Sequence, residues 1–244
     1  MKFYTTFLLL FLASIFTESF SQNNRPQEPK KPFNYTLEEV VFTNSKANNI
    51  KFSGTLTLPK EVSKPPVVIL ISGSGPQNRN EELANHKPFL VISDYLTNHG
   101  IAVLRYDDRG TAKSEGNFST ATSHDFSLDA EAAVNYLKSR KDIDTNKIGL
   151  IGHSEGGLIA PMIASRNSDV AFIVLLAGPG VNGKTILETQ TRRAGELAGA
   201  PKAALDANEA LTNIIYGAVV NHSDFELIKT EIKTGLTNYK TKNS

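Results

Sequence analysis

The chain has 244 residues, of which 40% are hydrophobic and 21% are charged, and this size and composition fit one globular domain with a substantial core. Its formal net charge is +1 and its lysines and arginines are spread along the sequence, which excludes the charge pattern of a nucleic-acid-binding protein. The absence of cysteine excludes disulfide bonds, thiolate metal sites, a cysteine nucleophile and a lipid-modified cysteine after a signal peptide.

The first 21 residues have the pattern of a secretory signal peptide. Lys2 gives a positive start, residues 7–16 are apolar, and small residues at Ser19 and Ser21 suit cleavage after Ser21. The apolar run is shorter than the roughly 20 residues that a membrane span needs, and an uncleaved anchor is the alternative. The polar, proline-rich residues 22–36 predict a flexible leader. We therefore expect a secreted or periplasmic protein without a stable membrane span after cleavage.

Strands and helices are predicted in alternation along the next part of the chain. Two neighbouring strands at 37–43 and 50–58 suit an antiparallel pair. Alternation of the elements that follow implies βαβ units, hence an α/β fold with a mostly parallel sheet and helices on both faces. Apolar runs and helical spacing predict further strands at 67–72, 101–108, 147–152 and 170–178, and helices at 88–99, at 125–140 and from the serine turn to about 166.

Three loops follow predicted strands at their carboxyl ends, where open α/β sheets collect their chemistry. They are SGSGPQNRNEE (72–82), DDRGTAKSEGNF (107–118) and the turn GHSEG (152–156). The turn matches G-x-S-x-G, in which glycines two residues either side of a serine allow close backbone approach between a strand and a helix. The required strand and helix are both predicted here, so Ser154 is the expected nucleophile and a plain glycine-rich turn is the alternative.

The three motifs together resemble those of a known superfamily. GSGPQ followed by N-R-N-E (73–81), RYDDRG followed by S-x-G (105–116) and GHSEGG (152–157) stand in the order found in α/β-hydrolases. The resemblance covers about residues 37–180 and is greatest to bacterial esterases and to serine-aminopeptidase-like hydrolases related to prolyl oligopeptidase. It implies a serine hydrolase for ester, thioester or short peptide-like acyl substrates, and an α/β-hydrolase core over residues 37–183.

The resemblance also implies roles for individual residues. Ser154 matches the nucleophile, and the backbone amide of Glu155 matches one donor to the oxyanion. The second donor is expected in the loop after the third strand, with Ser74 chosen and its neighbours left open. Asp107 to Arg109 match buried polar contacts that brace this region, and the side chains of His153 and Glu155 are expected to point away from the attack path.

The base and the acid of a catalytic triad are not identified. In α/β-hydrolases the acid and then the histidine follow the serine, on loops after further strands. Downstream of Ser154 the only histidine is His222, which precedes a predicted helix with a capping box from Ser223 to Glu226. The upstream histidines, which are expected on the surface or at helix ends, are His86, His99 and His124. The downstream carboxylates, none after a convincing strand, are Asp169, Glu188, Glu196, Asp206, Glu209, Asp224, Glu226 and Glu231.

Residues 184–244 are predicted to form a helical cap. Leu211, Ile214, Ile215 and Ala218 give a helical apolar stripe. The strands that carry the acid and the base do not follow, so we expect the last strands of the fold to be missing and the chain to be an incomplete hydrolase.

Two functions remain from the sequence. The first is a serine hydrolase that acts through an acyl-enzyme on a small-molecule acyl substrate. The second is a non-catalytic pseudo-hydrolase or binding module that lacks the histidine and aspartate of the triad. Scattered histidines and the absence of a P-loop pattern give no indication of a metal or another cofactor. The sequence leaves the oligomeric state open.

Overall fold

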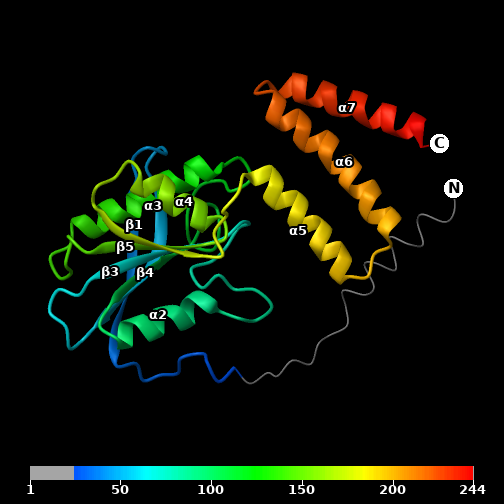
Figure 1. The fold of residues 1–244 in the computed structure, drawn as a ribbon. Helices are drawn as coiled ribbons and strands as arrows, with labels where there is room; N and C mark the ends of the chain where they lie inside the picture. The colour runs from blue at the N-terminus through cyan, green and yellow to red at the C-terminus, as the bar shows by residue number, and fades with distance from the viewer. Residues whose placement is uncertain (1–24, 244) are drawn as a thin grey trace. The chain divides into compact units, whose positions relative to one another are not determined.

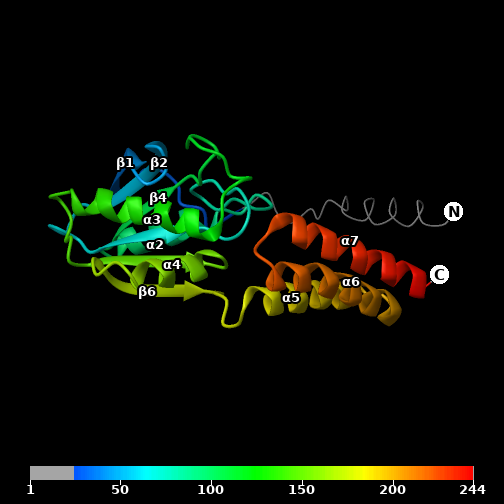
Figure 2. The same cartoon turned by 90° about the horizontal axis from the view of Figure 1, so that it is seen from above.

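A computed structural model describes residues 25–243, so the expected signal peptide lies outside the described part of the chain. The chain divides into two compact units, unit 1 up to Leu176 and unit 2 from Ala177 (Figures 1 and 2). Residues 25–34 of the expected leader contain only turns, bends and irregular backbone before the first strand begins at Tyr35.

Unit 1 contains a six-stranded sheet in the order β1-β2-β4-β3-β5-β6. β1 and β2 form an antiparallel pair and β2 also pairs antiparallel with β4, whereas β4, β3, β5 and β6 run parallel. The predicted α/β class with a mostly parallel sheet is therefore confirmed. The strands are β1 (Tyr35–Asn44), β2 (Ile50–Pro59), β3 (Val67–Ile71), β4 (Ala102–Tyr106), β5 (Ile148–His153) and β6 (Val170–Leu176).

Helices cover both faces of this sheet (Figure 1). α2 (Pro88–Asn98) packs through Phe89 on one face, while α3 (Ser123–Lys138) and α4 (Gly156–Ala164) pack on the other. All five residues of β3 are buried, as expected for a parallel strand that is covered on both faces. The core thus holds the carboxyl ends of β3, β4 and β5 in fixed positions.

The start of α3 differs from the prediction by two residues. Thr122 is the N-cap, its hydroxyl accepts a hydrogen bond from the Asp125 amide, and the Asp125 carboxylate accepts one from the Thr122 amide. This reciprocal pair satisfies two amides that a helix start would otherwise leave open, so the helix begins at Ser123 instead of at residue 125.

Unit 2 consists of the helices α5 (Gly183–Leu197), α6 (Lys202–Asn221) and α7 (Phe225–Lys242). The predicted capping box from Ser223 to Glu226 is wrong: Asp224 is the N-cap of α7 and its carboxylate accepts from the Leu227 amide at 2.9 Å. Both residue types cap helices, and Asp224 has the extended backbone of an N-cap directly before the helix.

Two close contacts join the helices of unit 2. A Cβ atom at Gly235 of α7 would lie 2.5 Å from Ile214 of α6, so the glycine lets the two helices approach. Gly195 of α5 has a similar relation to Leu205 of α6. Of the predicted apolar stripe on α6, Ala218 is fully buried whereas Ile215 remains 37% exposed.

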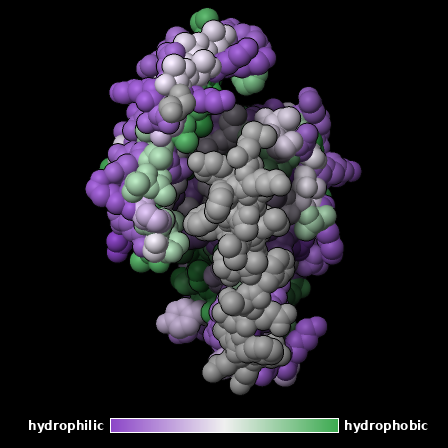
Figure 3. All heavy atoms as spheres, turned by 90° about the vertical axis from the view of Figure 1, so that its right-hand side faces the viewer, coloured by the Kyte–Doolittle hydropathy of each residue, from purple (hydrophilic) through white to green (hydrophobic). Residues whose placement is uncertain are grey.

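The surface of the described residues is mixed in polarity. On the face shown in Figure 3, hydrophilic side chains predominate among the coloured residues and hydrophobic ones form small separate areas. Within residues 25–243, no helix combines the length and the hydropathy that crossing a bilayer requires.

Candidate active site

Ser154 lies on a sharp turn between β5 and α4. Its φ angle is +50°, a left-handed conformation that a serine adopts at an energetic cost. The Ser154 amide donates to the Leu176 carbonyl at 2.9 Å, and its own carbonyl accepts from the Gly157 amide at 2.9 Å. The turn is therefore fixed on one side by β6 and on the other by the first turn of α4.

The two glycines of the motif are required by close backbone contacts. A Cβ at Gly152 would lie 2.0 Å from the Gly156 carbonyl oxygen, and a Cβ at Gly156 would lie 2.2 Å from the Ile71 carbonyl oxygen. Both distances are far below any real Cβ contact. The spacing of glycines around the serine therefore reflects the packing of α4 against the ends of β5 and β3.

The loop after β3 approaches this turn at Gly73. A Cβ at Gly73 would lie 3.1 Å from the Ser154 Cβ and 3.2 Å from the His153 Nδ1. The Gly73 amide donates to the carboxylate of Glu81 at 2.7 Å, and the same oxygen of Glu81 lies 2.7 Å from the His153 Nδ1. Buried Glu81 thus connects the loop to the residue that precedes Ser154.

Three backbone amides of the Ser154 turn and of the loop after β3 have no acceptor within the described part of the protein. Among the described residues, none accepts a hydrogen bond from the amides of Ser74, Gly75 or Glu155. The Gly73 amide, in contrast, is occupied by Glu81. Of the neighbours that the sequence left open as oxyanion donors, Gly73 is therefore engaged elsewhere, while Ser74 and Gly75 are available together with Glu155.

Carboxylate side chains brace the loop after β3 and the residues beside it. Asp108 accepts from the Ser72 hydroxyl at 2.7 Å and from the Gln77 amide at 2.9 Å. Burial raises the pKa of Asp108 to about 7, and these two hydrogen bonds oppose the rise. Arg109 pairs with buried Asp129 at 2.6 Å. Both residues thus have the bracing contacts that were expected of them.

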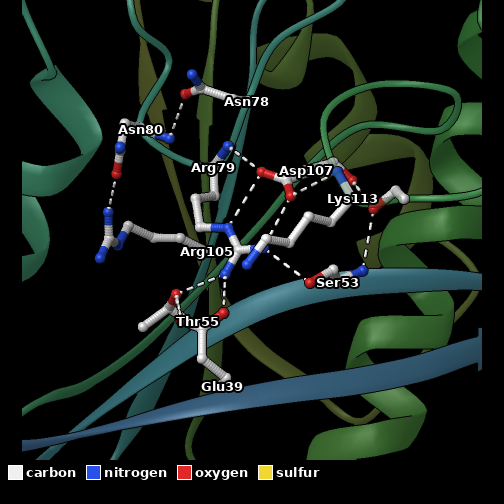
Figure 4. A network of polar contacts seen from close by, with 10 residues as sticks. Glu39, Ser53, Thr55, Asn78, Arg79, Asn80, Arg105, Asp107 and Lys113 are labelled. Atoms are coloured by element: carbon white, nitrogen blue, oxygen red, sulfur yellow. Dashed lines mark hydrogen bonds and ion pairs between the residues drawn. The ribbon is translucent and has the colours of Figure 1, made fainter.

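Arg79 fixes the middle of the same loop (Figure 4). Its guanidinium forms a two-point pair with Asp107, with donor distances of 3.1 Å and 2.8 Å, and also donates to Glu39, Thr55 and Ser53. The paired guanidinium lowers the pKa of Asp107 although burial acts in the opposite direction. The loop is thereby tied to β1, β2 and the end of β4.

The side chains that flank Ser154 are engaged with other residues. The Glu155 carboxylate accepts from the Ser123 hydroxyl at 2.5 Å, at the start of α3. The His153 ring pairs with Glu81. Neither side chain hydrogen bonds the Ser154 hydroxyl, which is consistent with the supporting roles expected of them.

No histidine of unit 1 hydrogen bonds the Ser154 hydroxyl within the described residues. The His86 ring lies 2.8 Å from the Arg25 guanidinium, and the His99 ring lies 2.6 Å from the Tyr95 carbonyl oxygen. His124 is exposed in the first turn of α3. In unit 2, His222 is the C-cap of α6 and pairs with Glu231.

Residues 87–227, more than half of the chain, match the model of a family described as serine aminopeptidase, S33. The chain belongs to this S33 family. This family assignment agrees with the resemblance that the three motifs show.

The chain is also similar to individual proteins. The chain is 33% identical to esterase EstD of Thermotoga maritima over 139 residues, which are 57% of this chain and 33% of EstD. It is 26% identical to the Pyrococcus furiosus esterase Pf2001, with a TM-score of 0.54 over 70% of this chain and 60% of that one. The α/β hydrolase GrgF of Penicillium, at 22% identity and a TM-score of 0.52, shares the fold. The S33 chain thus spans about a third of EstD.

Two important residues of the candidate site were not predicted from the sequence. Glu81 and Arg79 were read only as part of the NRNEE stretch, yet they bind Gly73 and Asp107 respectively. Their partners lie 8 and 28 residues away, so no local spacing indicates these bonds. Within residues 25–243, no group of three or more histidine, aspartate or glutamate side chains is arranged to hold a metal ion.

Proposed function

We propose that the chain carries the nucleophile of a serine hydrolase, Ser154, which cleaves carboxylic ester bonds through an acyl-enzyme. The observation that carries the proposal is the left-handed backbone of Ser154 on a strand-to-helix turn, followed by the unpaired amide of Glu155. Strain of this kind persists only where the surrounding structure enforces it, and it exposes the serine hydroxyl at the end of β5.

The proposed reaction begins when the Ser154 oxygen attacks the acyl carbon and its proton passes to a base. The oxyanion that forms accepts hydrogen bonds from the Glu155 amide and from the Ser74 or Gly75 amide. The carbonyl re-forms as the protonated leaving group departs, and water then releases the acid from the acyl-enzyme. Since no histidine of unit 1 binds the Ser154 hydroxyl, we propose that another residue supplies the base and that these residues alone are an incomplete catalyst.

The proposed substrates are small carboxylic esters, with thioesters and short peptides as related acyl compounds. The esterase names of EstD and Pf2001 support the ester class, and the S33 description supports short peptides. Ester, thioester and peptide bonds each have a carbonyl carbon that a serine can attack. The attack produces an oxyanion that two backbone amides can stabilise.

The alternative is a non-catalytic pseudo-hydrolase that binds an acyl compound without cleaving it. The observation in its favour is the Ser154 hydroxyl without an imidazole partner in the described part of unit 1. A serine without a base is a poor nucleophile, because its hydroxyl stays protonated at neutral pH.

Labelling with a fluorophosphonate probe separates these functions. The purified chain and its Ser154→Ala variant are compared with each other and, where the natural reading frame continues past Ser244, with a form extended through it. Labelling of an extended form alone, lost on Ser154→Ala, supports a serine hydrolase whose base is absent from this chain. Labelling of the chain itself would contradict the proposed incompleteness, and His→Ala variants at the five histidines would then identify the base. An extended form that is never labelled would favour the pseudo-hydrolase.

We also propose that residues 1–21 direct export and are removed. The positive start, the apolar run and the small residues before Gln22 support this proposal. N-terminal sequencing of the protein purified from its own cells tests it. A first residue of Gln22 is expected, whereas an intact Met1 in the exported fraction would indicate an uncleaved anchor.

A further inference from the structure

Glu81 is a buried acid near the end of the loop after β3. The residue is 7% exposed, and no lysine or arginine among the described residues forms an ion pair with it. One carboxylate oxygen, Oε1, accepts a hydrogen bond from the Gly73 amide and contacts the His153 Nδ1, each at 2.7 Å. A buried carboxylate costs free energy unless hydrogen bonds replace its lost hydration. Gly73 and His153 are the residues that supply these bonds.

The backbone of Glu81 has an uncommon conformation. Its φ angle is +50°, in the left-handed region that residues other than glycine rarely adopt. The Glu81 amide donates to the Asn78 carbonyl at 2.8 Å, which closes a tight turn. Of the two consecutive glutamates that end the loop, Glu81 is buried whereas Glu82 is exposed. Such backbone strain persists only where the surrounding structure enforces it, and it is frequent at functional sites.

Both partners of Glu81 adjoin Ser154. His153 directly precedes Ser154 in the chain. A Cβ atom at Gly73 would lie 3.1 Å from the Ser154 Cβ, 3.2 Å from the His153 Nδ1 and 3.3 Å from the Glu81 Oε1, so these four residues meet around one point. Any movement of Gly73 would therefore change the space that is available to the Ser154 side chain.

Hydrogen bonding fixes the His153 ring through Glu81 alone. A carboxylate accepts hydrogen bonds, so the Nδ1 that contacts it carries a proton. The His153 side chain is 43% exposed, and no described residue forms a hydrogen bond with its Nε2. Loss of the Glu81 carboxylate would thus free both the ring of His153 and the backbone of Gly73.

We propose that Glu81 is a positioning residue for the reaction of Ser154. Its Oε1 holds Gly73 against the Ser154 side chain and fixes the ring of the preceding His153, which limits the orientations open to the serine hydroxyl. Glu81 acts through these two residues and transfers no proton. The inference rests on the proposed role of Ser154 as the nucleophile.

Nuclear magnetic resonance of the histidine rings tests the contact without any activity. The chain is labelled with ¹⁵N-histidine, and the His153 signals are assigned by their loss in His153→Gln. We expect a proton on Nδ1 that exchanges slowly with solvent. It should be lost in Glu81→Ala and kept in Glu82→Ala, the exposed neighbour. A His153 ring with its proton on Nε2 alone would overturn the inference, whether or not Ser154 reacts.

The rate of fluorophosphonate labelling measures the effect on Ser154 in the form of the protein that the probe labels. Glu81→Ala should slow labelling at least about tenfold, because a misplacement of about 1 Å can slow a reaction about a hundredfold. Glu81→Gln keeps an oxygen that can accept from the Gly73 amide, so it should react faster than Glu81→Ala. Equal rates for Glu81→Ala and the unaltered protein, or for Glu81→Ala and Glu81→Gln, would overturn the inference.

Ile143→Ala separates positioning from stability. Ile143 is a buried core residue that precedes β5, whereas Ser154 follows the carboxyl end of that strand. The substitution should lower the free energy of unfolding by leaving a cavity, with no change in the labelling rate. Slowing equal to that of Glu81→Ala would show that labelling follows stability and would overturn the role of Glu81. Absence of labelling in every form, despite the expected His153 signal, would instead contradict the proposed nucleophile, and the role of Glu81 in its reaction with it.

Discussion

Asp108 is a partly buried acid whose ionisation acts against folding. Burial raises its pKa to about 7 from an ordinary value of 3.8, so the folded chain holds the proton more tightly than the unfolded chain. The folded state therefore binds more protons between these two pKa values, and stability falls as the pH rises through that window. Above about pH 8 the contribution of Asp108 no longer changes with pH.

The variant Asp108→Asn tests this predicted loss of stability with rising pH, because asparagine does not titrate. Between about pH 5 and about pH 8, the free energy of unfolding of the unaltered chain should fall relative to that of the variant. Chemical denaturation at both pH values provides the measurement. Glu61→Gln, at an exposed position, is the control and should follow the unaltered chain. If the free energy of unfolding changed with pH in the same way for the unaltered chain and for Asp108→Asn, the raised pKa of Asp108 would be contradicted.

The turn at Ser154 depends on contacts between elements that a single added methyl group would disrupt. Gly156 lies where α4 meets the carboxyl end of β3, and a Cβ there would enter the backbone of Ile71. We expect Gly156→Ala to lower the free energy of unfolding by ~1–3 kcal/mol through overpacking. Thermal unfolding monitored by circular dichroism should show a clear decrease in the midpoint, by about 2–4 °C per kcal/mol.

Gly217 offers the matched control for this substitution. It lies inside α6, and a Cβ there would meet no atom within 4 Å. Gly217→Ala should therefore stabilise its helix by roughly 0.5–1 kcal/mol, because alanine loses less backbone entropy than glycine. If Gly156→Ala and Gly217→Ala changed the free energy of unfolding equally, close backbone contact would not explain why the G-x-S-x-G motif has glycine at position 156.

The order and type of the elements in unit 1 could be predicted because each buried strand is a short apolar run bounded by turn residues. β3 and β5 were predicted within one residue of their observed ends. Helix starts were less certain, because Thr122 and Asp224 compete with neighbouring residues that cap equally well in isolation. The glycines around Ser154 follow from a local motif, whereas Glu81 and Arg79 act across distant parts of the chain.

At the scale of the whole molecule, β6 is an open edge of the sheet. Among the described strands it pairs only with β5. Phe172, Val174 and Leu175 on this strand are 43%, 40% and 46% exposed. Unpaired apolar edge strands favour association with other chains.

We therefore expect the chain to self-associate as its concentration rises, and Val174→Lys to shift it towards the monomer. A lysine on an edge strand opposes pairing because its charge would have to be desolvated. Sedimentation velocity over a range of concentrations measures the effect. Val41→Lys on β1, the opposite edge strand that already carries Glu38 and Glu39, is the control. A chain that stays monomeric throughout would show that the edge is protected.

The hydrogen bond from the Ser154 amide to the Leu176 carbonyl links the proposed nucleophile to the end of this edge strand. Edge strands open by local fluctuations at a lower free energy than the centre of a sheet. Each time the end of β6 frays, the backbone of Ser154 loses one of the bonds that hold its left-handed conformation. Amide hydrogen exchange at Ser154 should then be as fast as exchange along β6 and faster than exchange in β3. Loss of the reactive geometry would accordingly precede global unfolding on heating.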